Sequence, residues 1–361
     1  MITFDLPTEE ALLLRDTAER FVADHYTLPQ RAAMVQAAAD QTPMHWAAMA
    51  ELGWLAAPLP EAVGGLGLGP AQAVPLLEVL GAGLVLEPVV PVAMHCAATI
   101  ARALPAAEAE AALAPVLSGA RIEVMAEGNT GAPITATRDG DRLSLSGTAP
   151  MVPGGAAASA FWCVADLSGA RVLVRIAAEA AAVTPFRLLD GQAAARVCFD
   201  GVSCAAEAAV FDCGAALAFG AAMGLLGNLA ETCGLIDGLF QATLDYVKMR
   251  EQFGRPIGRF QSVQHRMADM FIAREEAQSM LRLAAEAVES GDAGFRTRLV
   301  SAARVKIGDH ARKVLRDAVQ LHGGMGVTDE VAVGHMVKRL LVLTQMGGSR
   351  GAHLKRFRDA A

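Results

Sequence analysis

The sequence predicts a mainly helical α+β protein in which a small β module separates two helical blocks. Three observations predict this fold class. Apolar residues recur at helical spacing in the first and last thirds of the chain and alternate with period two between them. The composition is 53% hydrophobic and rich in alanine, the residue with the highest helix propensity. The 361 residues suffice for two or three modules around a large core.

The first helical block covers about residues 1–117. Thr8 is placed to cap a helix whose first turn carries Glu9 and Glu10, where the helix dipole favours acidic side chains. Apolar residues then follow at helical spacing: Leu14, Ala18, Phe21 and Val22. The glycine-rich loop at 59–69 has neither a preceding strand nor the G-x-G-x-x-G spacing, so we do not expect it to bind nucleotide phosphates.

The middle block, about residues 118–210, has the period of β-strands. The alternating residues are Leu143 and Leu145, then Val172, Val174 and Ile176, then Val197 and Phe199. Turn residues such as Asp139 and Gly140 separate these runs. We therefore expect a middle antiparallel β domain.

The last block, residues 211–361, is helical throughout. One periodic stretch includes Phe260, Met267 and Phe271, and another runs from Ser301 to Leu321. The second ends at Gly323 and Gly324, a common helix stop. Long helices with short connections predict an antiparallel bundle.

Composition excludes several classes of protein. A net charge of -7 disfavours a nucleic-acid partner. The six cysteines form no C-x-x-C pair, so we expect buried thiols rather than a disulfide framework or a metal site. The N-terminal residues lack a basic segment followed by a long apolar run, which disfavours a signal peptide. Acidic residues and prolines interrupt the apolar stretch 71–101, so we expect no membrane span and a cytoplasmic protein with subunit contacts.

Two segments carry more specific information: YVKMREQFGRPIGRFQSVQHRMADM (246–270) and AVQLHGGMGVTDE (318–330). Taken singly, Arg250 could form a surface ion pair and Gly323 could only cap a helix. Taken together, the two segments resemble the acyl-CoA dehydrogenase family. The helix–sheet–helix order and the loop PEAVGGLGLG (60–69) are similar to that family as well.

The resemblance implies a fold and an activity. Members combine an N-terminal α domain, a middle β domain and a C-terminal four-helix bundle that hold FAD. The flavin takes a hydride from the β-carbon of an acyl-CoA thioester while a glutamate removes the α-proton. An electron-transferring flavoprotein is the expected electron acceptor.

The resemblance also assigns flavin-binding residues. The R-x-x-F-G motif matches Arg250 and Phe253, and the arginine meets the FAD pyrophosphate. A second contact pair matches Phe260 and Gln261. The Q-x-x-G-G motif matches Gln320, Gly323 and Gly324, whose glycines admit close approach of the backbone. In family assemblies these groups reach a flavin held mainly by the neighbouring subunit.

The sequence departs from the family where a member holds its own flavin. The T-E-P-x-x-G-S-D signature of the middle domain should fall near residues 125–141, where only Glu127 is retained. A W-I-T-like stretch that touches the flavin ring is replaced by residues 151–155, MVPGG.

The catalytic glutamate is missing from both positions where members carry it. Met346 replaces it in the C-terminal loop, and Gly224, followed by Leu225, replaces it on the helix before the R-x-x-F-G motif. Glu231 lies seven residues beyond Gly224, roughly 10 Å along a helix, and Asp237 lies further on. Four histidines in the last block are expected to be structural or surface residues: His265, His310, His322 and His335.

Three interpretations remain open. The chain is a partner subunit that lends part of a flavin site to a second dehydrogenase-like chain, as in the small-subunit type of bacterial heteromeric acyl-CoA dehydrogenases for bulky steroid or dicarboxylate CoA esters. Alternatively, it is a catalytic homo-oligomer with a relocated base, Glu231. The third interpretation is a flavin-free scaffold of the same fold. The sequence does not identify the acyl group.

Overall fold

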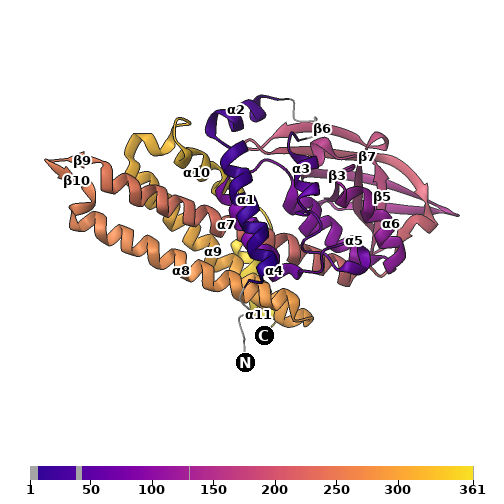
Figure 1. Cartoon of the computed structure of the whole chain (residues 1–361). Coiled ribbons are helices and arrows are strands. Elements are labelled where there is room, and N and C mark those ends of the chain that lie inside the picture. Colours follow the sequence, from indigo (N-terminus) through magenta and orange to yellow (C-terminus); the bar gives the residue numbers. More distant parts are fainter. Residues whose placement is uncertain (1–6, 38–42, 130, 361) are drawn as a thin grey trace. The chain divides into compact units, whose positions relative to one another are not determined.

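The structure, a computed structural model, describes residues 7–37, 43–129 and 131–360 (Figure 1). The chain divides into two compact units. The helical unit comprises Met1–Ala32, Pro70–Val85 and Leu225–Ala361, and the sheet unit comprises Ala33–Gly69 and Leu86–Gly224. The predicted mainly helical α+β class is confirmed. The division into three domains near residues 117 and 210 stays a prediction.

Long helices build most of the helical unit. They are α1 (Glu9–His25), α4 (Gly69–Ala82), α8 (Gln261–Glu289) and α9 (Ala293–His322), followed by the shorter α10 (Ala332–Leu343) and α11 (Arg350–Asp359). The predicted cap of α1 is confirmed, because the Thr8 hydroxyl accepts a hydrogen bond from the Ala11 N–H. Helix α9 ends where predicted, at Gly323, whose φ of 63° suits glycine.

Helix α7 (Gly214–Met249) is the longest helix of the described chain, with 36 residues. It begins in the sheet unit and continues into the helical unit. By length and composition it could cross a membrane, but 78% of its most apolar window is buried inside the structure. Burial of this kind is typical of a core helix.

The sheet unit contains one eight-stranded sheet between residues 123 and 210. Its strands are β1 (Glu123–Glu127), β2 (Ile134–Asp139), β3 (Arg142–Pro153), β4 (Ala160–Leu167), β5 (Ala170–Ala177), β6 (Ala182–Arg187), β7 (Ala193–Ala205) and β8 (Ala209–Val210). The alternating residues Val172, Val174 and Ile176 are all buried, as their period predicts.

The sheet is mixed rather than purely antiparallel. Its order is β6-β7-β3-β2-β4-β5-β8, with β1 paired to β4. Strand β4 pairs in parallel with both β1 and β2, and the other pairings are antiparallel. Period-two alternation gives the exposed face of a strand but not its direction relative to neighbours, so the sequence did not reveal the parallel pairs.

Short helices complete the sheet unit. They are α3 (Trp46–Glu51), the π-helix η2 (Val90–Ala97), α5 (Ala98–Ala103) and α6 (Ala106–Leu117), while α2 (Leu28–Gln36) crosses the boundary between the units. Segment η2 and α5 run close to the start of α7. A Cβ on Gly220 would lie 1.8 Å from the Thr99 hydroxyl oxygen, so only glycine allows this approach.

Candidate functional site

Arg250 directly follows the last residue of α7 and opens a tight hairpin. Its N–H donates to the Tyr246 carbonyl at 2.8 Å, and its carbonyl accepts from the Ile257 N–H at 2.8 Å. The strands β9 (Glu251–Gln252) and β10 (Arg255–Pro256) pair antiparallel beyond it. The backbone of Arg250 is therefore fixed on both sides, while its side chain is exposed.

The hairpin turn explains why phenylalanine and glycine occur together here. Phe253 and Gly254 both have positive φ, at 55° and 77°, as a two-residue turn of the primed type requires. Phe253 is 91% exposed, and its ring meets Phe260 edge-on with the centroids 6.1 Å apart. The Arg255 guanidinium lies 4.3 Å from the Phe260 ring centroid. Gln261, the exposed first residue of α8, follows directly.

The second motif lies at the same end of the helical unit (Figure 1). The ring of Tyr246, one turn before Arg250, stacks on His322 with the centroids 4.4 Å apart. His322 immediately precedes Gly323, so the stack ties the ends of α7 and α9 together. A Cβ on Gly323 or Gly324 would meet no atom within 4 Å, which leaves their backbone open to a ligand. Gln320 is exposed beside them.

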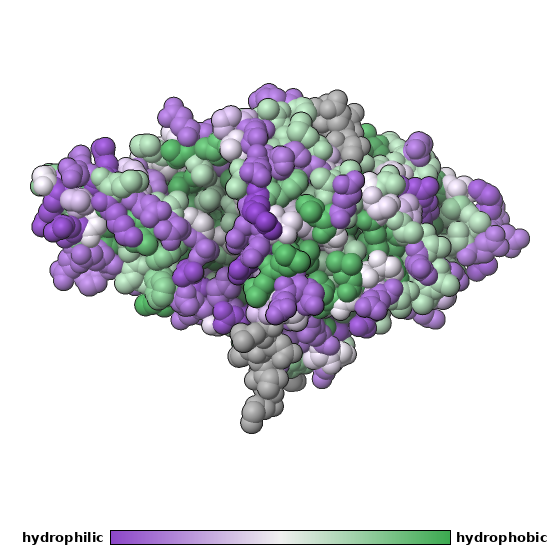
Figure 2. Space-filling view, in the orientation of Figure 1, coloured by the Kyte–Doolittle hydropathy of each residue, from purple (hydrophilic) through white to green (hydrophobic). Residues whose placement is uncertain are grey.

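The seven residues that the resemblance assigned to flavin therefore lie at the connected ends of α7 and α9 and at the start of α8. They supply an exposed cation, two aromatic rings, two amide side chains and an open glycine backbone. Figure 2 shows hydrophilic side chains gathered at this end, around β9 and β10. A guanidinium matches the oxygens of a pyrophosphate, and an accessible backbone allows close approach. The surface thus fits part of an FAD site.

Two glycines in the stretch that replaces the W-I-T-like residues pack closely against neighbouring side chains. A Cβ on Gly154 would lie 2.7 Å from Pro88 Cβ, and one on Gly155 would lie 2.8 Å from Val152 Cγ1. Gly154 also has a φ of 73°. This stretch therefore has no room for side chains at residues 154 and 155, and it lacks the residues that the resemblance assigns to the flavin ring.

Gly224 is packed against the side chain of His95, a residue of the π-helix η2. A Cβ at residue 224 would lie 2.9 Å from His95 Cβ and 3.1 Å from His95 Cγ. Both residues belong to the sheet unit. The space that a base at position 224 would need is therefore filled by His95.

His95 in turn faces Glu127, the last residue of β1. Its Nε2 lies 3.9 Å from Glu127 Oε1. The His95 side chain is 28% exposed and that of Glu127 is 50% exposed. Burial lowers the pKa of His95 below its ordinary value, and the Glu127 charge acts in the opposite direction. The imidazole is neutral near pH 7 and can accept a proton.

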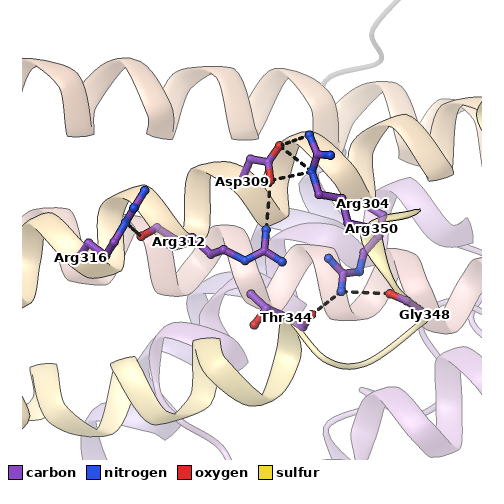
Figure 3. A network of polar contacts seen from close by, with 7 residues as sticks. All are labelled: Arg304, Asp309, Arg312, Arg316, Thr344, Gly348 and Arg350. Atoms are coloured by element: carbon purple, nitrogen blue, oxygen red, sulfur yellow. Dashed lines mark hydrogen bonds and ion pairs between the residues drawn. The ribbon is translucent and has the colours of Figure 1, made fainter. Parts of the chain in front are cut away.

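Met346 lies in a loop between α10 and α11 that a buried arginine organises (Figure 3). The Arg304 guanidinium donates to the carbonyls of Thr344 at 2.6 Å, Met346 at 3.2 Å and Gly348 at 3.4 Å. Burial lowers the pKa of Arg304, which remains a cation at neutral pH. Arg304 therefore holds the loop through the backbone carbonyls of the loop. At the position of the family base, the loop has no ionisable side chain.

Two further contacts fix this loop. A Cβ on Gly347 would lie 2.8 Å from the Leu225 side chain, so the residue after Gly224 packs beside the residue after Met346. The His353 ring nitrogen Nε2 lies 2.7 Å from the Gly347 carbonyl oxygen. Asp309 accepts hydrogen bonds from Arg350 and Arg312, which anchors the start of α11 on α9 (Figure 3).

The first two acids that follow Gly224 along α7 are engaged in ion pairs. Glu231 is buried and pairs with the buried Arg339 through a short contact. Asp237 pairs with Arg274. Each of these carboxylates is already bound by a guanidinium.

Three residues with a clear geometric role were not singled out by sequence reasoning: His95, Tyr246 and Arg304. Their partners lie between 32 and 129 positions away along the chain, and one sequence carries no signal for such contacts. For His95 a weak signal existed, since it is the polar residue of the apolar run PVAMHCAATI (91–100).

The fold and the exposed motif pair are those of a family of FAD-dependent oxidoreductases. The chain belongs to the acyl-CoA dehydrogenase family, since residues 8–120 match the family's N-terminal domain and residues 220–360 match its C-terminal domain. Members of this family are FAD-dependent oxidoreductases.

Individual relatives agree with this assignment. Acyl-CoA dehydrogenase FadE27 of Mycobacterium tuberculosis is 28% identical over 321 residues, 85% of each chain. A 3-sulfinopropanoyl-CoA desulfinase of Paraburkholderia xenovorans is 36% identical over 124 residues, which are 34% of this chain and 31% of that protein. The ChsE4-ChsE5 complex of Mycobacterium tuberculosis gives a TM-score of 0.91 with 25% identity, covering 99% of this chain and 98% of the other. A steroid acyl-CoA dehydrogenase variant, Tcur3481-Tcur3483, gives 0.87 with 27% identity, covering 98% and 97%.

Proposed function

We propose that this chain is a partner subunit in FAD-linked α,β-dehydrogenation of an acyl-CoA thioester and that it lacks a catalytic glutamate of its own. One contrast carries the proposal. Arg250, Gln320 and Gly323 are exposed, whereas Gly154 and Gly155 pack closely against Pro88 and Val152 in the stretch where the family's flavin-ring residues are missing. These observations support a chain that lends one half of a flavin site to a neighbour and lacks the residues that would hold its own flavin ring.

The relatives support a second, unlike chain. Two of the similar structures are named as pairs, the ChsE4-ChsE5 complex and Tcur3481-Tcur3483, and the latter is a steroid enzyme. We infer a partner that resembles an acyl-CoA dehydrogenase and supplies the glutamate and the flavin cradle. A bulky CoA ester is the favoured substrate class, and an electron-transferring flavoprotein is the proposed electron acceptor. The proposed location is the cytoplasm.

In this arrangement Arg250 neutralises the FAD pyrophosphate, and the backbone of Gly323 and Gly324 lies against the dinucleotide. Phe253 and Phe260 cover apolar parts of it, and Gln261 and Gln320 offer amide hydrogen bonds. Bound FAD supplies hydride acceptance, which protein side chains do not provide. The alternative with Glu231 as a relocated base has less support, because that carboxylate is buried against Arg339.

Co-expression with candidate partner chains tests the proposal. We expect this chain alone to purify without colour and the complex to be yellow, with FAD released on denaturation. A chain that binds FAD fully by itself would favour the homo-oligomeric dehydrogenase. Complexes that never contain flavin would favour the scaffold and overturn the proposal.

A further inference from the structure

The π-helical segment η2 presents one partly exposed ionisable side chain. Most of its residues are buried, including Val92, Met94 and Cys96, whereas the His95 side chain is 28% exposed. π-helical turns are rare and occur frequently at functional sites. The irregular backbone therefore places a histidine at the surface of an otherwise apolar segment.

Helix α7 holds this ring from behind. Gly224 leaves the space that the His95 Cβ and Cγ fill, and a Cβ on Gly220 would lie 3.0 Å from the His95 carbonyl oxygen. Two glycines one turn apart thus allow η2 to lie directly on α7. The ring stands at the point on α7 where a side chain of residue 224 would otherwise project.

The charged groups around the ring favour its protonated form once a proton arrives. Glu127 Oε1 lies 3.9 Å from Nε2, within ion-pair distance. Strand β1 also carries Glu123, but its carboxylate is buried and bound by Arg175 and by the Trp162 N–H. Glu127 is therefore the acid that is available to stabilise an imidazolium at position 95.

We propose that His95 and Glu127 form a proton-accepting pair that takes the α-proton of a bound CoA thioester. The substrate class rests on the proposed function. In the step, the α C–H bond breaks, its electron pair stays on the thioester as an enolate, and the proton bonds to Nδ1, the ring nitrogen not directed at Glu127. Glu127 stabilises the resulting imidazolium. The step is reversible and needs no oxidant, and in D₂O the carbon regains a deuteron.

Hydrogen exchange tests this step without flavin chemistry. The purified full chain is incubated in D₂O with butanoyl-CoA and octanoyl-CoA, and mass spectrometry follows α-deuteration. We expect the wild type to catalyse exchange and His95→Gln to lose about 10²–10⁴-fold of the rate, the usual contribution of general-base catalysis. Glu127→Gln, a change at a half-exposed residue, should lose about tenfold, which is the effect of roughly 1.4 kcal/mol. His265→Gln, a change at an exposed histidine on α8, is the matched control.

A second readout separates a chemical role from a structural one. In ¹H–¹³C NMR spectra, the ring signal lost in His95→Gln should titrate below the ordinary histidine range, and Glu127→Gln should lower that midpoint further. Wild-type exchange no faster than buffer, or equal exchange in folded His95→Gln, would overturn the pair. Failure of exchange in a complex with normal flavin content would refute only the pair. Exchange by a chain whose complexes never bind flavin would refute only the proposed function.

Discussion

His95 occupies the space beside Gly224. Close packing therefore requires glycine at this position, which is also one of the two positions where family members carry the catalytic glutamate. Its Cβ position lies within 3.1 Å of two His95 carbon atoms. Contacts this short force a shift of the neighbour. The family position for a base on α7 is therefore closed to any larger side chain unless the histidine moves.

Substitution of Gly224 by alanine should therefore destabilise the protein, although alanine normally favours a helix. We expect Gly224→Ala to lower the free energy of unfolding by about 1–3 kcal/mol, the usual cost of overpacking. Urea denaturation measures it. Gly351→Ala in α11, where a Cβ would meet nothing within 4 Å, is the control and should gain up to about 1 kcal/mol. In a His95→Ala background the penalty should shrink by at least half, and an unchanged penalty would rule out the contact as its cause.

Loss of Arg250 should weaken flavin binding without unfolding the chain. A charge-assisted hydrogen bond contributes about 1.5–3 kcal/mol, so Arg250→Ala should raise the dissociation constant of FAD in the complex roughly 10- to 100-fold. Flavin absorbance after gel filtration measures occupancy, and circular dichroism checks the helices. Arg138→Ala, which removes an exposed arginine on β2, should leave occupancy unchanged. Equal occupancy in both variants would remove Arg250 from the site.

Exposed apolar side chains on the helical unit predict assembly. Met249, Phe271 and Ile272 are 74%, 46% and 54% exposed. Exposed apolar groups of this kind are typical of subunit contacts. We expect light scattering at micromolar concentration to report more than one chain of 37.6 kDa. A strictly monomeric protein, alone and with every candidate partner, would contradict the shared-site proposal.

The sequence predicted the parts of this fold that depend on local chemistry. Thr8 caps α1, the alternation at Val172 and Val174 gives a buried strand face, and Gly323 ends α9. It did not predict the π-helical form of η2, because η2 reads as an ordinary apolar run. It also did not predict the parallel pairing of β1 with β4, since strand direction depends on contacts distant in sequence.

The same distinction holds for the candidate site. The motif residues around Arg250 and Gln320 were identified from the sequence because each group is local. The sequence did not show that the two groups lie side by side, because the stacking of Tyr246 on His322 that brings them together is a contact between residues distant in sequence. The roles of these residues toward FAD remain predictions that the Arg250 experiment addresses.

Glu78 should make stability depend on pH. Burial raises the pKa of Glu78 to about 7, although a hydrogen bond from Gln278 acts in the opposite direction. The stabilisation from Glu78 is fully present below its ordinary pKa of 4.5, where the carboxyl group is protonated in both the folded and the unfolded chain. Between pH 4.5 and about 7 the unfolded chain releases a proton that the folded chain retains, so stability falls as pH rises.

Glu78→Gln removes this titration. The difference in melting temperature between Glu78→Gln and the wild type should therefore become more positive from pH 4.5 to about 7 and then level off. Differential scanning fluorimetry at half-unit steps of pH measures it. Glu330→Gln, at an exposed position, controls for the loss of one carboxylate. A difference independent of pH would show that Glu78 ionises normally in the folded protein.

The last prediction concerns turnover by the chain alone. We expect no appreciable dehydrogenase activity with any acyl-CoA, even with added FAD, in a ferricenium reduction assay. The family's flavin-ring residues are missing around Gly154, and neither Gly224 nor Met346 can take a proton. Gly224→Glu should not restore activity, because His95 fills the space that its side chain needs.

Met346→Glu is the cleaner test, because Arg304 binds the backbone of this loop and the substitution leaves that contact intact. If only the base were missing, this variant would gain measurable turnover, since a general base contributes about 10²–10⁴-fold. We expect no gain in the isolated chain, because an acid without a held flavin has no hydride acceptor beside it. Strong turnover by the unaltered chain would refute the partner-subunit proposal and point to a base within this chain, either His95 or Glu231. Turnover by Met346→Glu alone would show that this chain holds flavin unaided.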